Sequence, residues 1–402
     1  MFAPPNLDRI PFGRPFIVGK ELYYIAKAVE QGGLAGDQAF TKLCHQWLEA
    51  RIGCHRALLT HSCTAALEMA AILTDVGPGD EVIMPSYTFV STANAFALRG
   101  ATPVFVDIRP DTLNLDERLV AAAITERTRA IVPVHYAGVS CDMDTIAHLA
   151  DDHRLWVVED AAQAIQSTWK GKPLGSLGHL ACLSFHETKN VIAGEGGALL
   201  VNDERLVERA EIIREKGTNR SQFFRGQVDK YTWVDLGSSY LPGELIAAFL
   251  YAQFEHADVI TAQRRATVKR YEDALRPLHD AGHLTLPATP LSEAGNGHLF
   301  YFLARDLGER TALLERIRAA GVFAVFHYVP LHSSPAGRRY GRCGSGMQVT
   351  DDVADRLVRL PLYHAMSDAE QDRVLQVVSD FYRSGARAAV RPASPHLEPS
   401  LS

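Results

Sequence analysis

The sequence contains an apolar run that ends in two acids and a small polar segment, Leu155-Trp156-Val157-Val158-Glu159-Asp160-Ala161-Ala162-Gln163. Such a run is typical of a strand buried on both faces, as in a parallel sheet. Ligands collect at the carboxyl ends of strands in open α/β sheets, so Asp160 is a candidate functional residue. The alternative is that Asp160 caps the following helix.

Short apolar runs alternate with amphipathic stretches on both sides of this segment, from about residue 55 to residue 202. Strands are expected at residues 57–60, 81–84, 104–106, 130–134, 155–159, 180–185 and 197–201. Helices are expected at residues 64–74, 91–98, 117–124, 144–153 and 204–215. This alternation predicts an α/β fold with a mostly parallel central sheet that is covered by helices on both faces.

The pattern changes after residue 215, where residues 217–239 indicate a long loop of the kind that is often functional. A helical region over 243–278 leads into a smaller C-terminal α+β domain. Its expected elements are strands at 300–304 and 324–328 and helices at 310–319, 350–358 and 368–382. We therefore predict a large domain with an N-terminal arm over 1–245, a small domain over 246–385, and a disordered tail over 386–402.

The composition excludes several classes of protein. The chain has 402 residues, of which 47% are hydrophobic, and a net charge of −6 without a long basic run, so nucleic acid is not an expected partner. Its 6 cysteines show neither a CxxC pair nor metal-ligand spacing and are expected to be free thiols. No signal peptide and no apolar run near about 18 residues is visible, which favours a cytoplasmic protein without a membrane span.

A lysine follows the next predicted strand in Ser184-Phe185-His186-Glu187-Thr188-Lys189-Asn190, and a glycine-rich turn over 194–197 comes after it. A lysine at the mouth of a buried strand can form a Schiff base with an aldehyde cofactor, although most lysines are solvated surface charges. The carboxylate of Asp160 would then pair with a protonated pyridine nitrogen of that cofactor.

His186-Glu187 begins a HExxH zinc motif, but Asn190 replaces the second histidine, so no metal is expected.

A phosphate site is predicted where His61-Ser62-Cys63-Thr64-Ala65-Ala66 opens a helix directly after a strand. The same residues are compatible with ordinary capping. No P-loop and no GxGxxG motif follows this strand, which disfavours nucleoside triphosphate or NAD as the ligand. Tyr87 and Phe89 follow the strand over 81–84 and would stack on a flat ring, the alternative being core packing.

Histidine and tyrosine pairs follow two further strands, as His135-Tyr136 and as His327-Tyr328, with His332 shortly after the second pair. As a set at strand ends these residues are candidate substrate contacts. Each histidine could instead be a structural residue whose hydrogen bonds are satisfied inside the protein.

Taken together, these segments resemble the DegT/DnrJ/EryC1/StrS family of sugar aminotransferases, which have the aspartate-aminotransferase fold (fold type I of pyridoxal-phosphate enzymes). The resemblance covers about residues 11–384. Its motifs occur in the family order, over residues 62–64, 85–92, 132–135, 159–163, 184–189 and 327–332.

The resemblance implies a role for each matched residue. Lys189 would hold pyridoxal 5′-phosphate, which alternates with pyridoxamine 5′-phosphate, Asp160 would bind the ring nitrogen, Gln163 would reach the ring hydroxyl, and Phe89 would stack on the ring. The phosphate would be held by Ser62, Cys63, Thr64 and Ser184. Family members often add an asparagine from the partner subunit to the phosphate, and the shorter Ser239 occupies that position here. The resemblance also implies a homodimer with shared active sites.

The runs over 85–96 and 215–233 are similar to family members that aminate C4 of a dTDP-linked sugar. The expected reaction transfers the amino group of L-glutamate to dTDP-4-dehydro-6-deoxy-D-glucose and gives dTDP-4-amino-4,6-dideoxy-D-galactose. The alternatives are the gluco epimer as product, amination at C3, and a non-catalytic regulatory protein on the same fold. A related dehydratase branch has histidine in place of the Schiff-base lysine, and Lys189 disfavours it.

Overall fold

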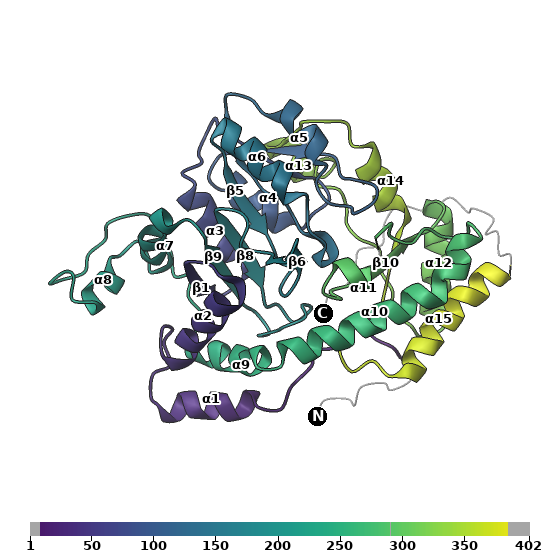
Figure 1. Cartoon of the computed structure of the whole chain (residues 1–402), viewed down its shortest axis with the longest axis horizontal. Coiled ribbons are helices and arrows are strands. Elements are labelled where there is room, and N and C mark those ends of the chain that lie inside the picture. The colour runs from purple at the N-terminus through teal and green to yellow at the C-terminus, as the bar shows by residue number, and fades with distance from the viewer. Residues whose placement is uncertain (1–8, 290, 385–402) are drawn as a thin grey trace.

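The computed structural model describes residues 9–289 and 291–384 and shows one large sheet with a smaller α+β part beside it (Figure 1). The tail predicted to be disordered, residues 386–402, lies outside the described residues. Within the described residues, no helix is both long and apolar enough to cross a membrane.

Eight strands form the large sheet in the order β1-β9-β8-β5-β4-β2-β3-β11. Their bounds are β1 Arg56–Thr60, β2 Glu81–Pro85, β3 Thr102–Val106, β4 Thr128–Ile131, β5 Trp156–Asp160, β8 Leu180–Ser184, β9 Gly197–Val201 and β11 Arg342–Cys343. Neighbouring strands are parallel except that β9 runs against both β1 and β8. The predicted α/β class with a mostly parallel central sheet is therefore confirmed.

Helices cover both faces of this sheet because successive strand residues point to opposite sides. Val82 and Met84 of β2 pack with α3 and α4, whereas Ile83 packs with α5 and α6. Farther along the sheet, β1 and β9 pack against α2 and α9. The covering helices are α2 Ala39–Ile52, α3 Cys63–Leu73, α4 Val90–Ala97, α5 Glu117–Ala123, α6 Met143–His153 and α9 Glu244–Phe254.

The C-terminal part is built around a two-stranded antiparallel sheet, β10 with β12. The long helix α10 leads from α9 toward α12 and α15 (Figure 1). The elements of this part are α10 Ala257–Asp280, β10 Phe300–Leu303, α12 Leu307–Ala319, α14 Gln348–Arg356, β12 Leu357–Leu360 and α15 Asp368–Arg383.

Several elements differ from the sequence prediction. The helix predicted over 350–358 ends at Arg356, because Leu357 and Val358 are buried as the start of β12 against β10. The strand predicted over 324–328 is reduced to one bridge between Val325 and Arg359. Helix α1 (Glu21–Glu30) and helix α2 were not predicted, and the predicted loop over 217–239 contains the short helix α8 (Arg220–Phe224).

The two parts of the chain are joined at several points, and the boundary near residue 245 stays a prediction. β11 comes from beyond that boundary and pairs with β3 at the edge of the large sheet. Arg342 of β11 also forms an ion pair with Glu81 of β2, at 2.6 Å. In the other direction, Ile10 forms a parallel bridge with Val322.

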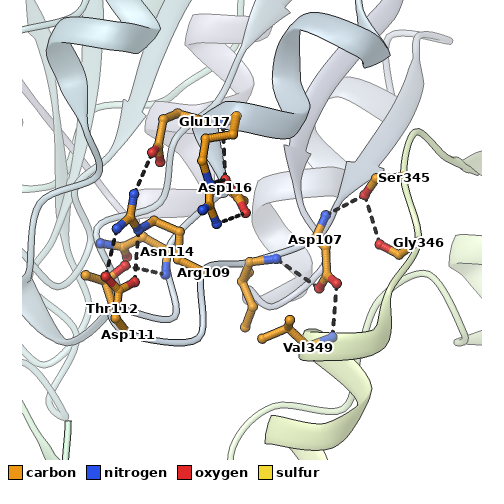
Figure 2. Close-up of polar contacts among 12 residues, drawn as sticks. Asp107, Arg109, Asp111, Thr112, Asn114, Asp116, Glu117, Ser345, Gly346 and Val349 are labelled. Atoms are coloured by element: carbon orange, nitrogen blue, oxygen red, sulfur yellow. Dashed lines mark hydrogen bonds and ion pairs between the residues drawn. The ribbon is translucent and has the colours of Figure 1, made fainter. Parts of the chain in front are cut away.

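Asp107 forms a further junction directly after β3 (Figure 2). Its carboxylate accepts hydrogen bonds from the backbone N–H groups of Val349, at 3.0 Å, and Thr350, at 2.8 Å. Its own N–H donates to the Ser345 hydroxyl, at 2.9 Å. A carboxylate at this position satisfies free N–H groups in the first turn of α14 and favours its dipole.

Candidate active site

Lys189 lies in the loop between β8 and β9 and is half-buried. Burial lowers the pKa of its amine from the ordinary lysine value; Cys63 and Asp160 oppose this shift, and the positive charge of Arg359 adds to it. A lower pKa increases the fraction of neutral amine, which is the nucleophilic form of lysine. The environment therefore favours reactivity at this position over a solvated surface charge.

Asp160 ends β5, and its neighbour β8 ends at Ser184 just before the loop that carries Lys189. The Asp160 side chain is buried, and its carboxylate accepts one hydrogen bond from the Thr92 hydroxyl, at 2.7 Å, and one from the Ala162 N–H, at 3.2 Å. It has no ion-pair partner within the described residues. A buried carboxylate without a cation is costly, so the site is suited to a cationic ligand atom.

Thr92 was not predicted as a site residue, yet it orients Asp160. The Thr92 side chain is completely buried on α4, and its hydroxyl also contacts the hydroxyl of Thr88, at 2.8 Å. Because Thr92 donates its proton to a carboxylate, it must accept the proton of Thr88. The two threonines therefore form a short directed chain that ends at Asp160.

The anion site was predicted at the start of α3. Ser62 is the N-cap, and its hydroxyl accepts the Ala65 N–H at 3.1 Å. The N–H groups of Cys63 and Thr64, at the start of the helix, have no acceptor among the described residues. A Cβ on Gly197 would lie 2.5 Å from the Cys63 nitrogen. Glycine at this position thus lets the helix start approach β9 and Ser184.

Gln163 is buried and makes two contacts through its side-chain amide. Its Oε1 accepts the Ala137 N–H at 2.7 Å, and its Nε2 donates to the Tyr328 hydroxyl at 3.0 Å. An amide nitrogen carries two donors, so one remains for a ligand oxygen. This contact brings Tyr328 next to the segment that carries Asp160.

A group of aromatic side chains surrounds the contact between Tyr136 and His327, whose hydroxyl and Nδ1 are 3.0 Å apart. Burial, together with the positive charges of Arg359 and Lys189, keeps the pKa of His327 well below its usual range, so the ring is neutral at pH 7. The other rings of this group are those of Tyr87, Tyr301 and Tyr328.

The histidines of the predicted substrate set differ in their surroundings. His135 is completely buried: its Nδ1 accepts the Cys141 N–H at 3.2 Å, which leaves Nε2 to donate to Glu159 at 2.9 Å. These contacts favour the structural alternative for His135. His332 is partly buried, and its Nδ1 lies 2.8 Å from the Ser86 hydroxyl.

Two predicted cofactor residues are exposed. Phe89 precedes α4 with 58% of its side chain accessible, which leaves its ring free to contact a ligand. Ser239 is also exposed, at the end of the loop over 217–239, where it forms a bridge with Glu215. Its place in the site therefore depends on the predicted partner subunit.

Sequence reasoning missed several charged and polar residues contributed by the C-terminal part. Arg359 of β12 lies close enough to influence Lys189 and His327. Asn190, beside Lys189, contacts the backbone oxygen of Asn296, at 3.0 Å, and the ring of His298, at 3.1 Å. None of these three residues from the C-terminal part stands in a motif at a predicted strand end, which was the signal used to choose candidates.

The arrangement fits pyridoxal phosphate in two respects. The unpaired carboxylate of Asp160 matches a protonated ring nitrogen, and the free N–H groups at the start of α3 match a phosphate. Lys189 lies near both, since Cys63 and Asp160 each influence its pKa.

Comparisons with known proteins agree with this reading. The family model described as "DegT/DnrJ/EryC1/StrS aminotransferase family" matches residues 20–379. The chain is 32% identical over 378 residues to GDP-perosamine synthase of Caulobacter vibrioides, covering 92% of this chain and 97% of that protein. It is 37% identical over 321 residues to a protein of Geobacillus stearothermophilus named pleiotropic regulatory protein, covering 79% and 82%.

Among solved structures, Spr1654 of Streptococcus pneumoniae in its PMP form superimposes with a TM-score of 0.85. It is 26% identical, and the match covers 93% of this chain and 99% of that one. The chain therefore belongs to the DegT/DnrJ/EryC1/StrS aminotransferase family and is a sugar aminotransferase that depends on pyridoxal phosphate.

Proposed function

We propose that this chain transfers the amino group of L-glutamate to C4 of dTDP-4-dehydro-6-deoxy-D-glucose in the cytoplasm and gives dTDP-4-amino-4,6-dideoxy-D-galactose. The observation that carries the chemistry is the half-buried Lys189 amine, with its lowered pKa, near the unpaired carboxylate of Asp160. The choice of sugar is supported by the runs over 85–96 and 215–233. A relative named GDP-perosamine synthase, whose name specifies a nucleotide-linked sugar, supports the substrate class.

The bound cofactor supplies an aldehyde carbon that takes up the amino group and a ring that withdraws electrons from the neighbouring carbon. Lys189 would hold the cofactor through its side-chain nitrogen, and its free, neutral amine would accept the α proton of glutamate. In the second half of the ping-pong cycle, the Lys189 ammonium would deliver a proton to C4 of the sugar.

The surrounding residues bind and orient. Asp160 would hold the ring nitrogen in its charged state, and Thr92 keeps the carboxylate in place. The start of α3, with Ser62, Cys63, Thr64 and the nearby Ser184, receives the phosphate. Gln163 would offer its remaining donor to the ring oxygen, and Phe89 would cover the ring face.

A homodimer is part of this proposal. Helix α8 and the loop that follows it project away from the large sheet (Figure 1), and they expose 69% of Phe224 and 74% of Trp233. Exposed aromatic side chains on a projecting segment are typical of a protein interface. The partner's copy of this segment would bring its Ser239 toward the neighbouring cofactor.

The direct test is Lys189→Ala, with the exposed Lys172→Ala as the matched control. Lys189→Ala should remove the yellow absorbance of bound cofactor and lower turnover by at least about 10³-fold, because the group that moves the proton is lost. Lys172→Ala should behave as wild type. Turnover of Lys189→Ala within about 10-fold of wild type would exclude the assignment.

The product is tested separately by NMR of the amino sugar formed from dTDP-4-dehydro-6-deoxy-D-glucose and L-glutamate. An axial amine at C4 is expected. An equatorial amine would show the gluco product, and an amine at C3 would show another class of sugar aminotransferase. Wild-type protein that binds the cofactor but turns over no keto sugar would favour the regulatory alternative.

A further inference from the structure

Lys189 and His298 each carry a hydrogen-bonding group that has no partner among the described residues. The Lys189 amine makes no hydrogen bond or ion pair there, whereas its backbone N–H donates to the His186 oxygen at 2.9 Å. His298 directly precedes the segment that forms β10 and is buried, with 6% of the residue accessible. A buried polar group without a partner is costly, so each group is a candidate for a contact that forms during the reaction.

Backbone contacts hold His298 in place. Its N–H donates to Asn296 Oδ1 at 3.0 Å, and its backbone oxygen accepts a hydrogen bond from Arg264 Nη2 at 2.7 Å. Asn296 in turn donates through Nδ2 to the backbone oxygen of Gln163, at 2.9 Å. The loop before β10 is therefore fixed against the segment that follows Asp160.

The side chain of Asn190 determines which nitrogen of His298 carries the proton. Asn190 Nδ2 lies 3.0 Å from the backbone oxygen of Asn296, which can only accept, so the amide oxygen Oδ1 faces the histidine ring. His298 Nδ1 lies 3.1 Å from that amide oxygen and must donate to it. In a neutral ring the other nitrogen, Nε2, then carries a free lone pair, and no donor among the described residues reaches it.

The His298 ring is neutral near pH 7. Burial, followed by the positive charges of Lys189 and Arg264, keeps the pKa of His298 well below its usual range, and Arg359 acts in the same direction. Asn190 directly follows Lys189 in the chain, so its contact with His298 places the ring beside the lysine. An acceptor without a donor therefore lies beside a donor without an acceptor.

We propose that His298 is a positioning residue for Lys189, and that its Nε2 accepts an N–H of the lysine amine whenever that amine is not bonded to the cofactor. The inference rests on the proposed function, in which the free amine of Lys189 moves the proton. A fixed acceptor limits the positions that a flexible lysine side chain takes. It also favours the ammonium form, because the hydrogen bond from a charged amine is the stronger one, and so it opposes the effect of burial.

The test compares two substitutions that separate the ring nitrogens. His298→Asn keeps a donor near the position of Nδ1 and removes the group at Nε2, whereas His298→Gln places an amide oxygen near Nε2. The first quantity is the pKa of the Lys189 amine in the cofactor-free protein, measured by mass spectrometry as the pH dependence of its acylation by acetic anhydride. His298→Asn should lower this pKa by about 1 pH unit, and His298→Gln should leave it within about 0.3 pH units.

The second quantity is the rate at which L-glutamate discharges the yellow absorbance of the cofactor-loaded enzyme in a single turnover. His298→Asn should be about 10-fold slower, because the amine is less often in position for the α proton, while the half-saturating concentration of L-glutamate changes by less than about 3-fold. His298→Gln should recover the rate to within about 3-fold of wild type. His148→Asn, at an exposed position on α6, is the control and should change neither quantity.

A measurement on the wild-type protein keeps the proposal testable if neither variant folds. Nitrogen-15 NMR of the cofactor-free protein at pH 7, with the ring signals assigned from the backbone, should show His298 with a proton on Nδ1 and none on Nε2. A proton on Nε2 would refute the proposal, because that nitrogen could not accept.

Two results with the variants would also overturn the proposal. Wild-type values of both quantities in His298→Asn would show that Nε2 does not contact the amine. Equal losses in His298→Asn and His298→Gln would show that the ring acts only through packing. Neither quantity involves the sugar, so a wild-type enzyme that meets these expectations but does not aminate the proposed keto sugar would refute the sugar assignment and leave the role of His298 intact.

Discussion

Two buried carboxylates lie at opposite ends of the strands of the large sheet, and they are stabilised in different ways. Glu81 begins β2 and forms ion pairs with Arg342, at 2.6 Å, and with Arg127, at 2.5 Å. Asp160 ends β5, and among the described residues its carboxylate accepts hydrogen bonds only from a hydroxyl and a backbone N–H.

We infer that this difference separates charges that stabilise the fold from charges that are left for a ligand. At the amino ends of the strands, the charge of Glu81 is neutralised by two arginines of the protein. These ion pairs join β2 to the segment before β4, through Arg127, and to β11, through Arg342. At the carboxyl ends, Asp160 and, from the small sheet, Arg359 have no protein counter-ion among the residues that the structure describes. An uncompensated buried charge destabilises the protein alone, so its retention indicates a ligand that supplies the missing partner.

The largest effect is expected for Asp160→Asn. Turnover should fall by about 10³-fold, because a neutral amide cannot hold a charged ring nitrogen. The unfolding free energy of the cofactor-free protein should stay the same or rise by about 1 kcal/mol, since a buried charge without a cationic partner is removed. Steady-state kinetics and urea unfolding measure the two quantities. If the unfolding free energy of cofactor-free Asp160→Asn falls by several kcal/mol, Asp160 is a structural charge like Glu81.

Glu81→Gln should show the opposite behaviour. The unfolding free energy should fall by about 3 kcal/mol because two arginines lose their counter-charge, while the activity of the folded enzyme is unchanged. The exposed Glu126→Gln is the control and should stay within about 0.5 kcal/mol of wild type. Urea unfolding at pH 7 measures both variants. If the Glu81→Gln variant folds fully but loses activity, Glu81 is not a purely structural charge, and the proposed difference between the amino and carboxyl ends of the strands is wrong.

The difference in unfolding free energy between wild type and Glu81→Gln should depend on pH. Hydrogen bonding to Arg342, together with Arg127, lowers the pKa of Glu81 to about 2. A lowered carboxylate pKa contributes stability that is present above the ordinary value and is lost as the pH falls toward 2. The gap in unfolding free energy between wild type and Glu81→Gln should therefore narrow below about pH 4.5. A gap that stays constant down to pH 3 would show that the ion pairs do not cause it.

The smallest effect is expected for Thr92→Val, which keeps the shape of the side chain and removes the hydroxyl between Thr88 and Asp160. Turnover should fall by about 10-fold, and the unfolding free energy should fall by about 1 kcal/mol, because a buried hydrogen bond is lost. Thr92→Ser keeps the hydroxyl and should recover most of the turnover. If the serine variant is as slow as the valine variant, packing of the methyl group matters more than orientation of the carboxylate.

The positions of the central residues of the candidate site were predictable because they depend on local signals. Asp160 and Lys189 each follow an apolar run that reads as a buried strand, and parallel strands bring their carboxyl ends to one edge. The start of α3 was predictable for the same reason. The family resemblance then supplied a cofactor for these residues, and the family match agrees with it.

The remainder depends on contacts between distant segments. The sequence places Arg359 just after residues that read as a helix, and only pairing with β10 shows the direction of its side chain. His135 follows a strand in the same way as a substrate contact would, but its partners Glu159 and Cys141 come from other segments. Thr92 reads as an ordinary residue of an amphipathic helix, and its bond to Asp160 is a tertiary contact.

The pairing of β11 with β3 has a consequence for the order of folding. During synthesis, β3 leaves one of its edges open until Arg342 and Cys343 have emerged, when most of the chain has already been made. An open edge strand is a template for pairing with other chains. A fragment ending near residue 245 should therefore aggregate even though it contains the other seven strands of the large sheet.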